Sequence, residues 1–204
     1  MSGIDGSLVV MENIDPRPLY RDTLTWLRAL AAAVPADRLT APTACPEWDV
    51  RGLLGHLVAT VDRARVIGEG GDPQTMPRVV AGVADDAWAD ALSTAEDKMA
   101  AVWADDDRLD ALVTVPWGQA PGRGALWGYL REALVHGWDL AVATGQEPEA
   151  DPVTAEAALA ETRRVLPARP RGGPIPFAEP VDPRPGAGPT EKLANWCGYA
   201  RAIG

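Results

Sequence analysis

The sequence predicts an all-α protein, a four-helix bundle followed by an extended Pro/Gly-rich C-terminal tail. Four long stretches place apolar residues at steps of three and four, the spacing of one helix face. Little of the chain shows the two-residue alternation of a strand. After about residue 166 the chain becomes too rich in proline and glycine for regular helix. Helices with one apolar face bury that face against one another, which favours a bundle.

The first two helices have recognisable starts. Pro16 and Pro18 suit the first turn of a helix over 16–34, because proline lacks only an N–H that this turn leaves unpaired. Asp49 is expected to cap a second helix over 50–68 with its side-chain oxygen.

The third helix is expected to begin after Asp85 or Asp86 as the capping residue and to end near Trp103. Its apolar face would consist of Trp88, Leu92, Ala95, Met99 and Val102.

The fourth helix follows a different kind of segment. A short extended piece is expected at Leu112, Val113 and Val115, before a Gly/Pro turn. The helix itself is predicted over 125–143 and should end at Gly145, a residue type that suits the end of a helix.

The expected organisation has three parts: a leader over 1–15, a bundle over 16–166 and a tail over 167–204. The bundle part includes a fifth helix, over 152–166, and the tail a short helical segment over 190–200. The tail is either disordered or an extended strap. We expect it to pack on the bundle, because it contains the large apolar side chains of Phe177, Leu193 and Trp196.

Composition excludes several classes of function. The chain has 204 residues, a formal net charge of −10 and a pI near 4.6, which argues against nucleic acid or an anionic membrane as a partner. No apolar stretch approaches the roughly 18 residues of a membrane span, and the acidic N-terminus does not resemble a signal peptide. The two cysteines, Cys45 and Cys197, form no disulfide framework or metal knuckle. We therefore expect a soluble cytoplasmic protein.

The stretch REALVHGWDLAVATG combines three ionisable groups at helical spacing. His136 is preceded by Glu132 four residues earlier and followed by Asp139 three residues later. On a helix these side chains share one side, and Glu132 and His136 are one turn apart. A carboxylate and an imidazole so placed can form half of a divalent metal site, although such pairs also occur as plain surface pairs.

The other histidine of the chain, His56, lies in the middle of the second predicted helix, on the flank of its apolar stripe. A bundle brings such flanks together in its interior. His56, Glu132 and His136 would then supply three ligands and leave one position open, as in catalytic zinc sites. Spacing alone also allows a hydrogen-bonded histidine that binds no metal.

Two motifs resemble the signature pair of the mycothiol-dependent maleylpyruvate isomerase N-terminal family, within the DinB-like superfamily. The segment before and within the second helix matches at Cys45, Pro46, Trp48, Val50 and His56. The fourth helix matches at Glu132, His136, Gly137, Trp138 and Asp139, and VPWG at 115–118 resembles the segment that precedes that helix in the family. The resemblance implies a DinB-like four-helix bundle with a divalent metal, usually zinc, held by His56, Glu132 and His136.

The resemblance also implies a chemistry. The family's isomerase carries a second, sterol-carrier-like domain that contributes to its active site, so we expect a short, single-domain relative with a different specific reaction. The leading hypothesis is a mycothiol-dependent transferase or isomerase, in which the metal holds a small thiol as thiolate. A metal-dependent hydrolase and a metal- or ligand-binding protein without turnover are the alternatives.

Supporting roles follow from position. Asp139 is expected to assist His136 by accepting a ring proton or ordering a metal-bound water; the alternative is a solvated charge. Tyr129 either lines the substrate pocket or packs in the core. Trp48 and Trp138 are given structural roles, and Cys45 that of a small buried apolar residue.

The ligand types suit Zn²⁺ best, with Ni²⁺ or Fe²⁺ as alternatives. The expected partners are a small-molecule thiol and an electrophilic substrate, with no nucleic acid and no membrane; a homodimer is left open.

Overall fold

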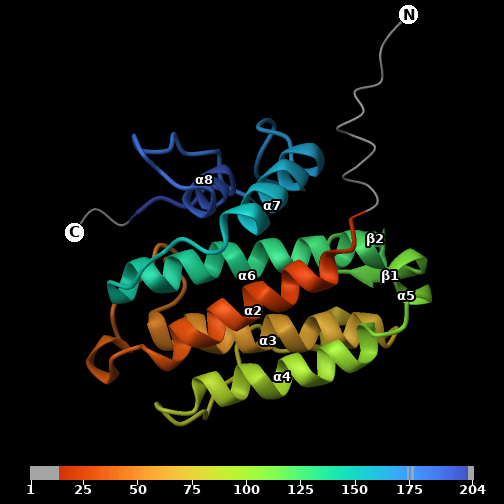
Figure 1. The fold of residues 1–204 in the computed structure, drawn as a ribbon, viewed down its shortest axis with the longest axis horizontal. Coiled ribbons are helices and arrows are strands. Elements are labelled where there is room, and N and C mark those ends of the chain that lie inside the picture. Colours follow the sequence, from red (N-terminus) through yellow and green to blue (C-terminus); the bar gives the residue numbers. More distant parts are fainter. Residues whose placement is uncertain (1–13, 174, 176, 202–204) are drawn as a thin grey trace, which may run out of the picture.

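A computed structural model describes residues 14–173, 175 and 177–201. Four long helices form the bundle: α2 (Pro16–Ala32), α3 (Val50–Gly68), α4 (Trp88–Trp103) and α6 (Gly122–Thr144) (Figure 1). Short elements connect them: η1 (Ala36–Arg38), η2 (Pro73–Thr75), α5 (Asp107–Asp110), β1 (Leu112–Val115) and β2 (Gly118–Pro121). Two further helices, α7 (Pro152–Val165) and α8 (Pro189–Trp196), lie on the outer side of α6 (Figure 1). The all-α class is thereby confirmed.

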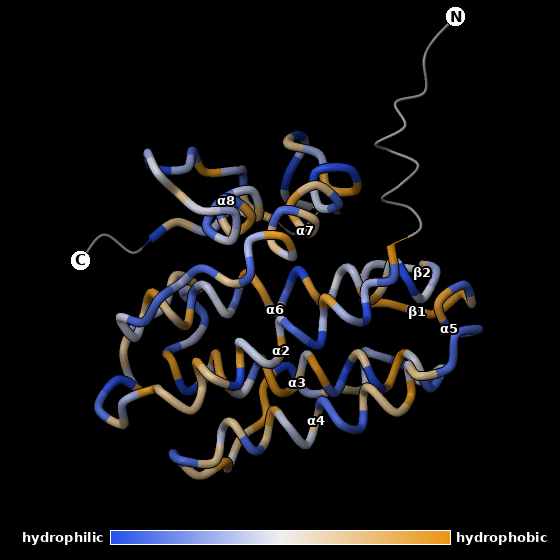
Figure 2. Tube along the Cα trace, in the orientation of Figure 1, coloured by the Kyte–Doolittle hydropathy of each residue, from blue (hydrophilic) through white to orange (hydrophobic). Residues whose placement is uncertain are grey.

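The bundle is built from neighbouring pairs. α2 and α3 each pack against both α4 and α6. Apolar residues recur along every one of these helices (Figure 2), and their side chains form one large buried core. The small hairpin of β1 and β2 pairs antiparallel from Leu112 opposite Pro121 to Val115 opposite Gly118 and leads directly into α6.

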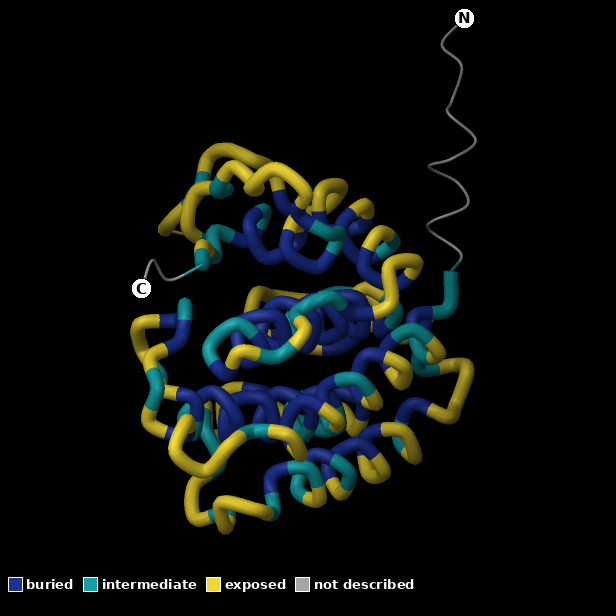
Figure 3. The backbone as a smooth tube through the Cα atoms, turned by 60° about the vertical axis from the view of Figure 1, so that its left-hand side comes forward, coloured by how far each residue is buried: buried dark blue, intermediate teal, exposed yellow. Residues whose placement is uncertain are grey.

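α6 is the central helix of the molecule. It contacts α2 and α3 on one side and α7 and α8 on the other, and its backbone lies among dark, buried segments (Figure 3). This explains why the sequence shows apolar residues on opposite sides of this helix. Close packing also requires Gly137, because a Cβ atom there would lie 2.3 Å from the Trp26 ring of α2.

Two predicted boundaries are confirmed and two are corrected. Asp49 caps α3 by accepting a hydrogen bond from the Gly52 N–H at 2.8 Å, and Gly145 ends α6 in the left-handed region at φ 73°. The third helix is not capped by Asp85 or Asp86: it begins at Trp88, and Asp85 forms an ion pair with Arg51.

The start of α6 was also predicted too late. The helix begins at Gly122, because the hairpin places this residue so that its N–H donates to the carbonyl of Ala111 at 2.9 Å. The extended piece at 112–115 is confirmed as β1. Its partner β2 was expected only as a turn, because the sequence GQAP has little strand preference.

The C-terminal part folds back on the bundle. α8 packs against α6 and α7, and it ends at Trp196, before the predicted limit of 200. Outside α8 the described tail consists of turns, bends and irregular segments, without further helix. The expected leader over 1–15 falls largely outside the described residues, which begin at Ile14. Among the helices that are described, none combines the length and apolar character needed to cross a membrane.

Candidate metal centre

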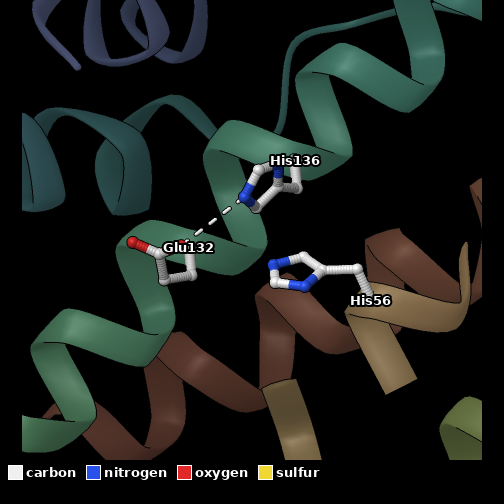
Figure 4. A group of neighbouring side chains, drawn as sticks. All are labelled: His56, Glu132 and His136. Carbon is white, nitrogen blue, oxygen red and sulfur yellow. Dashed lines mark ion pairs between the residues drawn. The ribbon is translucent and has the colours of Figure 1, made fainter. Parts of the chain in front are cut away.

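Two helices bring the three predicted ligands together. His56 comes from α3, and Glu132 and His136 come from adjacent turns of α6 (Figure 4). Their potential ligand atoms all lie within 4.8 Å of one another. The two imidazole rings meet edge-on, with centroids 4.9 Å apart, and Glu132 Oε2 lies 3.5 Å from His136 Nε2. The structure thus juxtaposes residues 76 and 80 positions apart in the sequence.

The orientation of His56 is fixed by its neighbours. Its Nδ1 lies 2.9 Å from the carbonyl oxygen of Arg78, and because a carbonyl only accepts, Nδ1 carries the proton. Nε2 then presents a lone pair, 3.4 Å from Thr60 Oγ1. The Trp48 ring stacks on the imidazole at 4.0 Å with an interplanar angle of 24°. Trp48, given only a structural role from the sequence, therefore also holds a candidate ligand in place.

The protonation states suit a cation. Burial, together with the nearby His136, lowers the pKa of His56 to about 4. Burial raises the pKa of Glu132, but the hydrogen bond from His136 and the charge of Arg131 outweigh it and bring this pKa to about 2. At neutral pH the site offers a neutral imidazole and a carboxylate, the forms in which these groups bind metals.

His136 has one unused nitrogen. Its Nδ1 is buried without a hydrogen-bond partner among the described residues. Asp139, expected to assist His136, is fully buried and accepts hydrogen bonds from the backbone N–H groups of Ala44 and Cys45 at 2.6 and 3.1 Å. It is therefore no solvated charge. Its hydrogen bonds hold the connection that precedes α3, and this connection carries Trp48.

A cavity of about 900 Å³ opens beside the three ligands. Between Ala125 and Ala141 of α6, Glu132 is the one residue that is not fully buried, and it lines this cavity together with His56. The opposite wall comes from α7 and the tail, including Phe177, Cys197 and Tyr199. Tyr129 is not among the lining residues described: it is 2% exposed and belongs to the core, the second of its two predicted roles.

Sequence reasoning missed several residues at this site. Tyr199, from the tail, meets His136 edge-on with ring centroids 5.5 Å apart. Nothing in the local sequence signals that contact, which depends on how the tail folds back. Arg131 also lines the cavity and lies 3.4 Å from Glu132. Its signal was present in the sequence, since it is a further charged residue in the otherwise apolar fourth helix.

The fold and the donor set define a class: a helix bundle with two imidazoles and one carboxylate converging from two helices beside a cavity. The sequence profile of the mycothiol maleylpyruvate isomerase N-terminal domain matches residues 20–141. The chain belongs to that family, which lies within the DinB-like superfamily.

Two relatives are similar to the chain over most of its length. Both are described as uncharacterized proteins of Mycobacterium tuberculosis, one from strain CDC 1551 / Oshkosh and one from strain ATCC 25618 / H37Rv. Each is 31% identical to this chain over 189 residues, covering 91% of this chain and 98% of the relative. No solved structure gives a significant match.

A divalent ion fits the residues present. Two ligand atoms bound to one tetrahedral zinc ion at about 2.0–2.2 Å lie about 3.3–3.6 Å apart, so a group whose atoms lie within 4.8 Å of one another can close on an ion by side-chain shifts of about 1 Å. The carbonyl bond at His56 Nδ1 is the support that a metal-binding imidazole usually has on its other nitrogen.

Proposed function

We propose that this protein binds one divalent metal ion, most simply Zn²⁺, through His56, Glu132 and His136, and that it catalyses transfer or isomerisation with a low-molecular-weight thiol, mycothiol first. The observation that carries the proposal is the convergence of these three side chains on one edge of a large cavity. The family supports a mycothiol-related role. Three protein ligands leave a further position for an exogenous group.

The thiol has to come from outside the chain. Cys45 and Cys197 both line the cavity, but burial raises the pKa of Cys45 above its usual value and that of Cys197 to about 12. At neutral pH both side chains remain protonated and poorly nucleophilic. The metal ion, when bound, favours loss of the proton from a thiol that coordinates it.

The protein's own residues arrange the reactants. His56 and Glu132 expose the site to the cavity, whose volume of about 900 Å³ is enough for a small thiol beside a second molecule. Trp48 and the Arg78 carbonyl keep His56 in one orientation. Tyr199 and the tail cover His136, which limits access of water from that side.

Two reactions between a thiol and an electrophile balance in atoms and charge at such a site. With a chlorinated aromatic substrate, the thiol proton goes to solvent, a carbon–sulfur bond forms and chloride leaves with the carbon–chlorine bonding electrons. With an unsaturated acid, the thiolate adds to the double bond, the resulting single bond rotates, and the thiolate leaves again, so that the double bond is isomerised and the thiol is recovered.

The experiment compares metal-replete with chelator-stripped protein against a panel of thiols and of electrophiles such as 1-chloro-2,4-dinitrobenzene and maleate. We expect a rate that requires both the metal and the thiol and that rises with pH until the bound thiol is ionised. Equal rates with and without metal, or no dependence on any thiol, would refute the transferase reading. Turnover without thiol would assign a metal-dependent hydrolase instead, and metal binding without turnover a binding protein.

A further inference from the structure

One guanidinium in the cavity wall is buried with incomplete pairing. Arg131, next to Glu132 on α6, is 8% exposed, and its Nε has no hydrogen-bond partner among the described residues. An ion pair joins its Nη2 to Glu132 Oε1 at a long 3.4 Å. A buried guanidinium with a vacant N–H is costly unless an acceptor meets it. Since Arg131 lines the cavity, such an acceptor can come from a ligand.

The other arginines that line this cavity have shorter contacts. Arg78 binds Glu47 at 2.8 Å, Arg164 binds Glu161 at 2.7 Å, and Arg63 donates to the carbonyl of Pro77 at 2.9 Å. In a chain of net charge −10, the described lining of the cavity nevertheless carries more arginine than acid: Arg63, Arg78, Arg131 and Arg164 against Glu132 and Glu161. The local charge favours an anionic ligand.

Apolar groups share the cavity with the Arg131 guanidinium. Its carbon lies over the Phe177 ring of the tail, 5.1 Å from the ring centroid, a cation–π contact. Trp117, Trp127 and Ile175 also line the cavity. The ligand that matches these surroundings has a compact anionic group joined to a planar apolar body.

The position of Arg131 relates the anion to the candidate metal. Glu132 has one oxygen 3.4 Å from Arg131 and the other 3.5 Å from His136. An anion held by Arg131 would therefore lie beside Glu132, which is itself one of the three candidate ligands. A planar guanidinium with parallel N–H groups matches a carboxylate in particular.

We propose that Arg131, backed by Phe177, is the subsite that binds the carboxylate of a planar, apolar carboxylic acid and sets its position beside the His56–Glu132–His136 group. The inference rests on the proposed function, since it assigns the class of the electrophilic substrate for the same site. Arg131 is on this view a specificity-determining residue.

The test measures binding by calorimetry and ligand-observed NMR on metal-stripped protein, so that no metal can hold the ligand. The probes are trans-cinnamate, its neutral counterpart cinnamamide, and phenylphosphonate. We expect cinnamate to bind about 10–100-fold more tightly than cinnamamide. Arg131→Gln should abolish this preference, and Arg131→Lys should retain only part of it. Arg63→Gln removes an equal charge from the same wall and should change the cinnamate Kd less than about threefold.

The outcomes separate cleanly. No cinnamate binding, equal affinity for cinnamate and cinnamamide, or a preference that survives Arg131→Gln would overturn the proposal. Tighter binding of phenylphosphonate than of cinnamate would overturn the carboxylate assignment. The comparison of probes on the wild type needs no variant, so a poorly folded Arg131→Gln protein would not remove the test. Neither metal nor thiol takes part in this binding test. Its failure would therefore leave the proposed thiol chemistry intact, and an absence of turnover would not affect the binding result.

Discussion

The two walls of the cavity are held in place by different forces. The bundle wall, from α3 and α6, rests on a continuous apolar core that includes the fully buried Trp103 and Trp138. The opposite wall, from α7 and the tail, also buries apolar groups but depends more on arginine. The guanidinium carbons of Arg163 and Arg171 both lie over the Trp196 ring, 5.0 and 5.8 Å from its centroid.

The buried carboxylate of Glu191 is a second polar anchor of that wall. It accepts hydrogen bonds from Arg184 at 2.9 Å and from Arg201 at 3.0 Å. This polar anchor completes the contrast with the apolar bundle wall.

The two walls are suited to different functions. Metal ligands need positions fixed to a fraction of an ångström, and close-packed helices provide that rigidity. A wall held by polar contacts at its edge is easier to adapt to the shape of a ligand.

The strongest test of the bundle wall is removal of its ligands. His56→Ala and His136→Ala should each abolish stoichiometric metal binding, because two remaining protein ligands hold zinc poorly. Elemental analysis of protein purified without chelator, followed by zinc titration, measures this. Glu132→Gln should also bind zinc more weakly. Glu69→Gln makes the same chemical change at an exposed glutamate and serves as the control. Retention of one ion per chain in both histidine variants would show that the metal binds elsewhere.

Truncating one tryptophan in each wall compares their packing directly. Trp103→Ala leaves a large cavity in the core and removes the hydrogen bond that Trp103 Nε1 donates to the Ala64 carbonyl at 2.8 Å. Urea unfolding should show a loss of about 3–5 kcal/mol. Trp196→Ala, at a half-buried site, should lose only about 1–2 kcal/mol.

Trp117, 53% exposed, serves as the control for this pair, since its replacement by alanine should change stability by less than about 0.5 kcal/mol. If Trp196→Ala were as damaging as Trp103→Ala, the two walls would form a single cooperative core and the contrast between them would be wrong.

Asp139→Asn tests the contact between α6 and the connection that precedes α3. The carboxylate now accepts from two backbone N–H groups, and an amide has only one oxygen to offer in its place. We expect a loss of about 1–3 kcal/mol in stability with the metal retained, and, if the protein turns over, a rate about 10–100-fold lower. Thermal unfolding with and without zinc measures the first effect. Unchanged stability would mean that these two hydrogen bonds make no net contribution to the free energy of unfolding.

The smallest expected effect concerns the pH dependence of the tail. Burial raises the pKa of Glu191, but hydrogen bonds from Arg201 and Arg184 outweigh it, so the pKa is lowered from its ordinary value of 4.5. The folded state then binds fewer protons than the unfolded state between the two pKa values, so stability rises with pH there. The contribution of Glu191 is complete above about pH 4.5 and disappears as the pH falls through the lowered folded-state value.

Glu191→Gln should accordingly cost about 1–2 kcal/mol at neutral pH and progressively less in acid, which thermal unfolding from pH 7 to pH 3 would reveal. Glu179→Gln removes the exposed pair with Arg169 and should cost less than about 0.5 kcal/mol at every pH. A constant difference between wild type and Glu191→Gln across that range would contradict the assignment.

Much of the bundle could be predicted from local patterns. The helix spacing placed α2, α3 and α6 to within a few residues, and the Asp49 cap and the Gly145 stop were recognised because each acts within one turn of its own helix. The start of α4 was misplaced because Asp85 has a better partner in Arg51, which is distant in sequence. β2 was missed because its pairing with β1, more than its own residues, makes it a strand.

The sequence by itself determined the all-α class and the two motifs that carry His56, Glu132 and His136, because helical periodicity and residue type are local properties. Only the tertiary structure decided that these three side chains meet within 4.8 Å, that Trp48 and the Arg78 carbonyl orient His56, and that the tail places Phe177 on Arg131 and Tyr199 near His136. These contacts join residues separated by up to 80 positions, and their formation depends on how complete helices pack, which no pattern within a single segment encodes.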